Sequence, residues 1–459
     1  MGIIVVVVVV VTVVSTSIQY CTAATRDAIC QKSRRGGGEA KSVKMAAFLL
    51  AVAVAGDVTC RDRWLEPFSS SSIWNTAVGS EAKFEPANLY SRAGYIDPFP
   101  GSFHNDQDFI VRASRDDPYT DWINQGDWDN EDHCKVQTKP GSGKPCSDKS
   151  TLIDGCVSRI RLPHSWTSAS DCDGDAKPDA SNCRSQPNHK NNNAMAILLP
   201  DNETLVQVQP AYRCGFGTPL FARWGNATDG APQRFPNVTS ILEDGLYGAH
   251  GGSGLSSIGG SIRLGELLPH TGPIKHALKI EVNNFWYYGL TRLNPKTAFN
   301  GGRTQYVWPA TGSNSGCCNG KYNGSNPYFA PGALLALTDS DADKVNTTTV
   351  IGAKIKDAMR DYGAYLVDGA GPVSHGPPHG PNKAAICMDA LVNAEMREQF
   401  GYAMTYPDGV SASNPPDKGG TLYWDLVHIF RHLSVVTNNR PSSVGGGGKP
   451  RVPTKPPIC

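Results

Sequence analysis

Residues 248–267 read GAHGGSGLSSIGGSIRLGEL and combine a loop rich in glycine and serine with a more apolar segment. Glycine adopts positive φ and lets a backbone or a ligand approach closely, so the pattern predicts a sharply folded loop with exposed amide groups. One histidine, His250, lies in this loop. Leu255 stands where the G-x-S-x-G motif of serine hydrolases needs its final glycine, so that motif is not formed.

Two segments with period-two alternation each carry an ionisable side chain into an apolar row. Residues 261–267 are predicted to form a strand in which Glu266 shares the face of the isoleucine and leucine. Residues 276–282, HALKIEV, likewise place His276 on the apolar face. A buried ionisable group must be paired or lie in a cleft, so Glu266 and His276 are candidate catalytic residues. His250 of the glycine-rich loop is a third candidate. A satisfied structural role is the alternative.

The clearest hairpin spans residues 193–214, where AMAILLP and TLVQVQPAYRC flank a Pro-Asp-Asn turn. Gln207 and Gln209 fall on one face of the second strand, and Tyr212 and Arg213 follow them. This polar row suits the hydroxyl and carboxylate groups of a glycan, so Gln207, Gln209 and Arg213 are predicted to bind substrate and Tyr212 to act as an acid. A solvent-exposed sheet face would show the same pattern.

Aromatic and acidic side chains gather in several segments that are rich in turn-forming residues. Residues 104–132 place aspartates beside tyrosine and tryptophan, and Trp286 follows the strand predicted over residues 276–282. Rings stack on the apolar faces of sugars, and carboxylates accept hydrogen bonds from hydroxyl groups, so Trp286 is a predicted substrate-binding residue. Arg263 is predicted to bind substrate as well. Solvated acidic loops and aromatic plugs beneath loops are the structural alternatives.

An acidic ladder in residues 171–182 spaces carboxylates at relative positions 1, 3, 5 and 9. Such spacing suits an oxygen-seeking cation, so a structural Ca²⁺ is expected here and no further cofactor is required. Ala176 and Asn182 stand where an EF-hand has glycine and glutamate, so the segment is not an EF-hand. A plain acidic loop is the alternative. The predicted calcium ligands are Asp171, Asp173, Asp175 and Asp179.

Two short apolar runs precede the main part of the chain. The valines of residues 5–11 lack a basic segment before them, whereas MAAFLLAVAVAG, from Met45, follows basic residues and ends in the small-x-small pattern of signal peptides. We therefore expect a leader over residues 1–55, with the signal peptide at 45–55 and an upstream extension at 1–44; an N-terminal anchor is the alternative. Both runs are too short for a comfortable membrane span, so none is expected in the mature chain.

Composition favours a turn-rich β protein. Lys plus Arg number 43 against 42 for Asp plus Glu, giving a net charge of +1 without a long basic block, which argues against nucleic acid as a partner. With Gly 48, Pro 33 and 19% charged residues, residues 56–437 are expected to form one mainly β domain, jelly-roll or β-sandwich-like, with a few peripheral helices. The helices are predicted at 348–362, 390–400 and 423–433. Residues 438–459, rich in glycine and proline, should form an extended tail, either a linker or an arm on the domain.

Cysteines and sequons agree with a secretory route. The chain has 13 cysteines, most of them after the leader and none in a C-x2-C pair, which favours disulfides over zinc. N-x-S/T sequons indicate a secreted glycoprotein. The sequon asparagines are Asn202, Asn226, Asn237, Asn323 and Asn346.

Several segments together resemble a family of secreted, mostly bacterial, β-rich proteins that are often found with carbohydrate-binding modules. They are PFSSSSIWNT, NNNAMAILLPDNETLVQVQP, GAHGGSGLSSIGGSIRLGEL, YGAYLVDGAG and VVTNNRPSSVGGGG. The resemblance spans about Pro67 to Pro453 and implies an association with carbohydrate, without a defined reaction. The acidic DCDGD loop and the cysteine-rich insertions depart from it, so calcium and disulfides are not part of what the resemblance implies.

The leading hypothesis is a secreted polysaccharide lyase. β-Elimination from a uronic acid needs a base, an acid at the leaving oxygen and a group that neutralises the carboxylate. His250 or His276 can serve as the base, Tyr212 as the acid, and Gln209 or Arg213 as the neutralising group.

Two alternatives remain open. A glycoside hydrolase needs a pair of carboxylates across the scissile bond, and Glu266 together with Asp106, Asp108 or Glu281 would supply it. A non-catalytic glycan-binding or cell-wall glycoprotein needs only the aromatic rings, glycans and cysteines.

Overall fold

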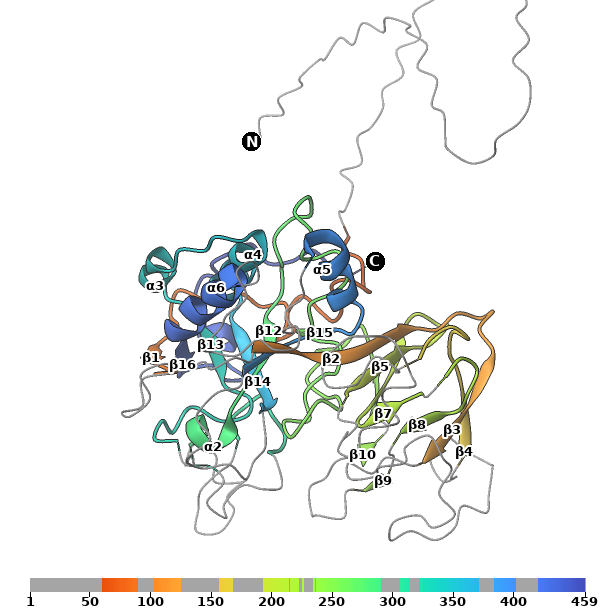
Figure 1. Cartoon of the computed structure of the whole chain (residues 1–459). Helices are drawn as coiled ribbons and strands as arrows, with labels where there is room; N and C mark the ends of the chain where they lie inside the picture. The colour runs from red at the N-terminus through yellow and green to blue at the C-terminus, as the bar shows by residue number, and fades with distance from the viewer. Residues whose placement is uncertain are drawn as a thin grey trace, which may run out of the picture. The chain divides into compact units, whose positions relative to one another are not determined.

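The computed structural model describes residues 60–89, 103–124, 157–167, 193–213, 215–222, 225–226, 234–235, 237–289, 306–313, 322, 324–370, 384–401 and 420–458. The described chain is rich in strands, and its largest element is a ten-stranded mixed sheet ordered β1-β16-β13-β14-β12-β15-β2-β5-β6-β11 (Figure 1). The strand-rich class is confirmed in this coarse form. The sheet contains the parallel pairs β12–β14, β15–β2 and β2–β5. The jelly-roll or sandwich arrangement stays a prediction.

The strands of this sheet are β1 (Phe84–Pro86), β2 (Phe103–Arg112), β5 (Met195–Leu198), β6 (Thr204–Val208), β11 (Asn237–Ser240), β12 (Leu278–Val282), β13 (Leu334–Ala336), β14 (Ala364–Gly369), β15 (Ala384–Asp389) and β16 (Ser434–Val436). A four-stranded sheet contains β3 (Tyr119–Asn124), β4 (Val157–Arg161), β7 (Ala211–Tyr212) and β8 (Leu220–Ala222). A small pair joins β9 (Gly225–Asn226) to β10 (Arg234–Phe235).

The longer helices contribute their apolar sides to one core on one face of the large sheet. Ile351 and Ile355 of α4, Met396 of α5 and Val427 of α6 belong to the same apolar cluster as Ile280 of β12. Helix α4 begins where Thr349 accepts a hydrogen bond from Gly352 N, as an N-cap does. All three predicted helices are confirmed within a few residues. The helices are α2 (Asn284–Tyr287), α3 (Asp339–Lys344), α4 (Val350–Asp361), α5 (Val392–Phe400) and α6 (Gly420–Arg431), with a 3₁₀ turn at Val444–Gly446.

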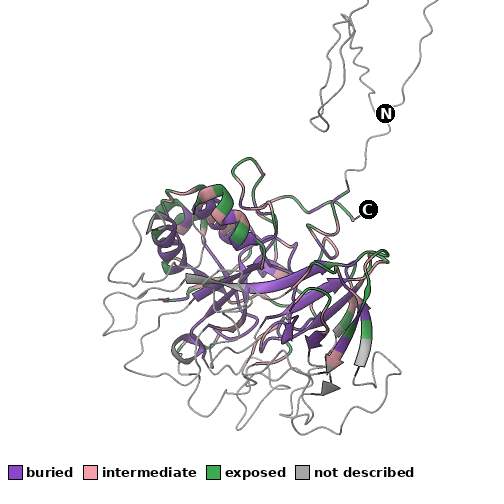
Figure 2. Cartoon of the chain, turned by 45° about the vertical axis from the view of Figure 1, so that its right-hand side comes forward, coloured by how far each residue is buried: buried purple, intermediate pink, exposed green. Residues whose placement is uncertain are grey.

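The central strands divide their side chains between two faces, as strand alternation requires. On β12, Leu278, Ile280 and Val282 join the cluster beneath the helices. Lys279 and Glu281 therefore point to the opposite face, and both are buried. The residues of the central strands are mostly buried, as Figure 2 shows. This second face is where the candidate site lies.

The predicted hairpin of residues 193–214 is confirmed as β5 and β6, which pair antiparallel from Met195–Val208 to Leu198–Leu205. The predicted alternation on β6 is confirmed too, because Leu205 and Val206 belong to different apolar clusters. The exposed face that was the alternative is excluded for Gln207, which is fully buried.

The strand predicted over residues 261–267 is wrong. Ile262 makes an isolated parallel bridge with Met388, and turns follow at once. Gly265 has φ +86°, a left-handed conformation that glycine tolerates and that ends extended structure. Leu264 is consequently 42% exposed while Ile262 is buried. The companion strand is correct only from Leu278 onward, so His276 precedes it.

The segment after residue 437 contacts the N-terminal part of the described domain. Asn438 accepts a hydrogen bond from Lys83 N at 2.8 Å, and Lys455 donates to Asn75 Oδ1 at 2.9 Å. Lys455 also forms an ion pair with Glu66 at 2.8 Å. This segment lies on the domain as an arm, one of the two arrangements expected. Within the described ranges, no helix has the length and apolar character needed to cross a membrane.

Candidate functional site

The glycine-rich loop is tied to the hairpin by Gln207. The side-chain Nε2 of Gln207 donates to Tyr247 O at 3.0 Å. Its Oε1 accepts from Ser257 N at 2.7 Å and from Ser256 Oγ at 3.1 Å. Each of these bonds satisfies a buried polar group, so Gln207 positions the loop. The structure thus gives this predicted substrate-binding residue a scaffold of intramolecular contacts.

The loop crosses the end of β14 at Gly251. Gln209, 2% exposed, accepts a hydrogen bond from Gly251 N through Oε1, and Ser253 N donates to Val367 O at 3.1 Å. Gly251 has φ +53°, and a Cβ there would lie 2.3 Å from Asp368 Oδ2. Only glycine combines this conformation with so close an approach. The neighbouring His250 is held in place as a consequence.

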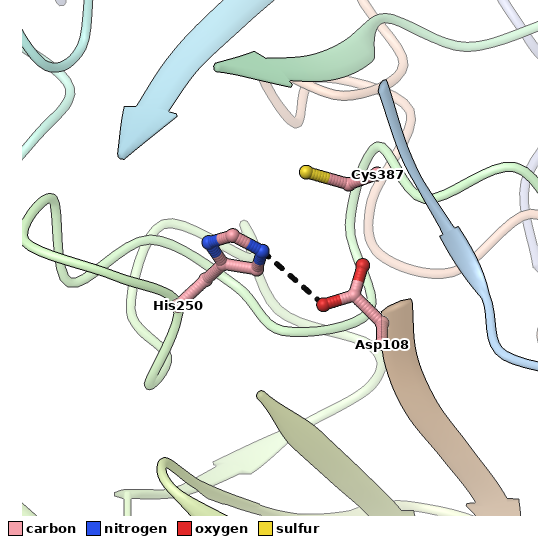
Figure 3. Close-up of side chains that lie close together, drawn as sticks. All are labelled: Asp108, His250 and Cys387. Atoms are coloured by element: carbon pink, nitrogen blue, oxygen red, sulfur yellow. Dashed lines mark ion pairs between the residues drawn. The ribbon is translucent and has the colours of Figure 1, made fainter. Parts of the chain in front are cut away.

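His250 faces a carboxylate on the sheet face opposite the helices. Its Nε2 lies 3.2 Å from Oδ1 of Asp108 on β2, and both side chains are fully buried. Figure 3 shows the two groups opposite each other, with the second ring nitrogen on the side of the imidazole away from Asp108. A carboxylate in this position stabilises the positive charge that an imidazole gains on taking a proton.

Asp108 is held by two further groups. Lys279 Nζ of β12 lies 3.0 Å from Asp108 Oδ2, and Ser261 Oγ donates to the same oxygen at 2.7 Å. Lys279 also donates to the carbonyl oxygens of Ser256 and Ser257, each at 3.1 Å. The ammonium group is therefore satisfied by three acceptors although it is fully buried.

The charges of this cluster explain the ionisation state of the carboxyl group. Burial alone would raise the pKa of Asp108, but the opposing effects of Lys279 and His250 prevail and the pKa is lowered. Asp108 is therefore an anion at neutral pH and a partner for a cationic imidazole. A cluster of His250, Asp108 and Lys279 can accept and stabilise a proton.

A second histidine–carboxylate pair lies at the edge of the same region. His276 Nε2 is 3.2 Å from Glu266 Oε2, and Arg263 N donates to that oxygen at 2.6 Å. Burial raises the pKa of Glu266, but His276 and the hydrogen bonds outweigh burial and the pKa is lowered. These side chains are slightly exposed, 7% for His276 and 17% for Glu266.

Arg263 lies between the two pairs. Its guanidinium stacks over Trp64 at 4.5 Å and lines a small recess together with His276, Trp74 and Ser261. Burial lowers the pKa of Arg263, although Asp389 and Glu266 oppose this effect. The predicted candidates His276, Glu266 and Arg263 are thus brought together, and Ser261 contacts both the recess and Asp108.

Tyr212 and Arg213 lie in a different setting, beside the four-stranded sheet. Tyr212 stacks on Phe221 with ring centroids 5.2 Å apart. Arg213 donates to the carbonyl oxygens of Pro163 and Thr218 at 2.8 Å and of Trp166 at 3.1 Å. These contacts organise loops, so neither side chain is brought to His250 by any of them.

Several expectations fall outside the described residues. Trp286 is part of α2, but its side chain is not among those that the structure describes. The acidic calcium ladder also lies outside it; its residues are Asp171, Asp173, Asp175 and Asp179.

Sequence reasoning missed the partners of His250. Lys279 carries a usable signal, because a lysine within the apolar strand LKIEV must be neutralised when both faces are covered. Asp108 was one acid among many in its region, and no local pattern distinguishes it. Cys387, a buried thiol on β15, offers no sequence signal for its position beside this pair.

No family model, no curated protein and no solved structure matches this chain. The geometry of its own residues therefore has to support any function.

Proposed function

We propose that the protein is a secreted enzyme that cleaves an acidic polysaccharide by β-elimination, with His250 as the general base. The observation that supports this most directly is the 3.2 Å contact between His250 Nε2 and the ionised, fully buried Asp108. The carboxylate favours the protonated imidazole, and the other ring nitrogen is then the atom that takes the proton.

Lys279 has a supporting part in this mechanism. Without its ammonium group, burial would favour the neutral form of Asp108, and a neutral carboxyl group would not stabilise the imidazolium. The base, the carboxylate and the ammonium group come from the loop, β2 and β12, so the fold assembles them. Tyr212 and Arg213 are left out of the proposed mechanism, because Tyr212 stacks on Phe221 and Arg213 donates to backbone carbonyl oxygens. In the proposed step His250 takes the proton from the sugar carbon and then gives it to the leaving oxygen.

Secretion and glycosylation belong to the same proposal. They rest on the leader, the cysteines and the sequons of the sequence. Two sequon asparagines suit modification: Asn346 is exposed after α3, and Asn202 lies in the β5–β6 turn. Glycosylated sequons lie on surface loops of secreted proteins.

The test is a turnover screen with protein from a secretory host. Alginate, polygalacturonate and glucuronan are incubated with the chain, and ultraviolet absorbance reports the unsaturated uronate that β-elimination leaves. We expect absorbance with at least one polymer. Absence of this signal on every uronate polymer, from folded protein, would contradict the proposal.

A glycoside hydrolase is the second candidate, because Glu281 and Asp368 are register partners on β12 and β14. Neighbouring strands lie about 5 Å apart, close to the carboxyl separation of retaining glycosidases. Reducing ends released from neutral glucans without unsaturated product, and lost in Glu281→Gln, would favour this candidate. Glycan binding without turnover that survives both His250→Ala and Glu266→Ala would instead indicate a binding protein.

A further inference from the structure

Three different donor atoms lie close together on the sheet face opposite the helices. One carboxylate oxygen of Asp108, one ring nitrogen of His250 and the sulfur of Cys387 all lie within 4.8 Å of one another. All three residues are buried, and they come from β2, the glycine-rich loop and β15 (Figure 3). β2 and β15 are parallel neighbours in which Asp389 pairs with Asp108, so Cys387 is two residues before the partner of Asp108 on the same strand face.

We propose that Asp108, His250 and Cys387 bind a divalent cation of the zinc class. The spacing of Asp108 and His250 fits such an ion. Tetrahedral zinc, with bonds of about 2.0–2.1 Å to nitrogen and oxygen, sets those two ligand atoms about 3.3 Å apart. The observed separation of Nε2 and Oδ1 is 3.2 Å.

Asp108 Oδ1 also offers an atom that a cation would stabilise. This oxygen is buried and lies 3.2 Å from His250 Nε2 without a hydrogen bond in the described part of the chain, whereas Oδ2 receives both Ser261 and Lys279. A buried anionic oxygen without a hydrogen bond is costly, and a cation in contact with it removes that cost. The atom that lacks a hydrogen bond is the one directed at His250.

Lys279 is compatible with the ion because it occupies the other side of the carboxylate. Its Nζ contacts Oδ2 and is fixed by the carbonyl oxygens of Ser256 and Ser257. The Asp108 carboxylate and a Cys387 thiolate offset the two charges of the ion. The charge of Lys279 then favours an anion as the fourth ligand, in the position that three-ligand zinc sites leave open.

The mixed donor set determines which ions fit. Thiolate and imidazole favour zinc and its transition-metal neighbours, whereas Ca²⁺ and Mg²⁺ require oxygen ligands. An ion at Nε2 withdraws electron density from the imidazole and lowers the basicity of the other nitrogen. With His250 as the base, as in the proposed function, zinc is therefore expected to inhibit turnover.

The experiment measures binding without substrate. Full-length protein freed of metal with a chelator is titrated with Zn²⁺ by calorimetry, and with Co²⁺ while the near-ultraviolet spectrum is recorded. We expect one zinc ion per chain and a cobalt charge-transfer band, because a thiolate ligand produces that band. Cys387→Ser should abolish the band and weaken zinc binding by about 100-fold or more, since even outer-shell changes cost 10- to 100-fold.

Matched variants keep the result interpretable. His250→Gln should weaken binding as Cys387→Ser does, whereas His276→Gln, in the pair that lacks a thiol, should leave the affinity unchanged. Circular dichroism establishes that each variant is folded. Equal zinc affinity in wild type, Cys387→Ser and His250→Gln, or a cobalt spectrum without the band, would overturn the site. Neither result depends on turnover, so failure of the proposed function is recognised separately.

Discussion

Two histidine–carboxylate pairs in this protein have the same nitrogen–oxygen distance, 3.2 Å, and differ in everything around it. The pair of His250 and Asp108 is fully buried and shares its carboxylate with the ammonium group of Lys279. The pair of His276 and Glu266 lies beside a recess, is partly exposed and receives a backbone N–H from Arg263. The comparison shows that the nitrogen–oxygen distance alone does not determine the chemical role of such a pair. Burial and the presence of a third charged group determine it.

The largest expected difference between the pairs is in turnover. His250→Gln removes the proposed base and should lower kcat about 100- to 10,000-fold, the usual contribution of general base catalysis. His276→Gln is the matched control. It should change kcat by less than about 10-fold, because His276 does not transfer the proton in the proposed mechanism. Initial rates on the polymer found in the screen, with thermal unfolding of each variant, measure this. Equal losses in both variants would remove the distinction.

Stability should separate the two regions next. Lys279→Met leaves Asp108 as a buried anion without its ammonium partner and should cost about 3–5 kcal/mol. Lys275→Met, at an exposed position beside the second pair, should stay within about 0.5 kcal/mol of wild type. Urea unfolding gives both values. A small effect of Lys279→Met would show that Asp108 takes up a proton at little cost.

Asp389, the register partner of Asp108, should show the opposite pH dependence to that of Glu266. Burial raises the pKa of Asp389 to about 6, so its contribution to stability is present below the unfolded pKa and is lost as the pH rises through 6. Asp389→Asn should therefore gain stability relative to wild type between pH 4 and pH 8, by up to about 3 kcal/mol. Unfolding of chelator-treated protein across this range tests it. A difference that does not vary with pH would contradict the shift.

The smallest effect is expected for the second pair. The pKa of Glu266 is lowered, so its stabilising contribution is present above the unfolded pKa and is lost as the pH falls through the lower folded value. Glu266→Gln should cost about 1–2 kcal/mol at pH 7, in the range of a hydrogen bond to a charged group, and less at pH 3. Denaturant titrations at the two pH values check this. A cost that persists at pH 3 would assign it to packing.

Local pattern predicted much of the scaffold. The hairpin of β5 and β6, the helix α4 and the alternation of β12 are confirmed, because neighbouring residues determine turn chemistry and the periodicity of helices and strands. The strand expected at residues 261–267 failed for a physical reason. A backbone bridge to β15 and the left-handed Gly265 override an alternation that is only local.

The sequence by itself determined that this is a strand-rich chain with a glycine-rich loop, and it singled out His250, Glu266 and His276 as candidate ionisable groups. Only the tertiary structure decided how they are paired: His250 with Asp108, and His276 with Glu266. The reason is that charge pairing acts through space. Asp108, Lys279 and Cys387 come from β2, β12 and β15, and parallel and mixed strand order brings them to one face without any trace in the local pattern.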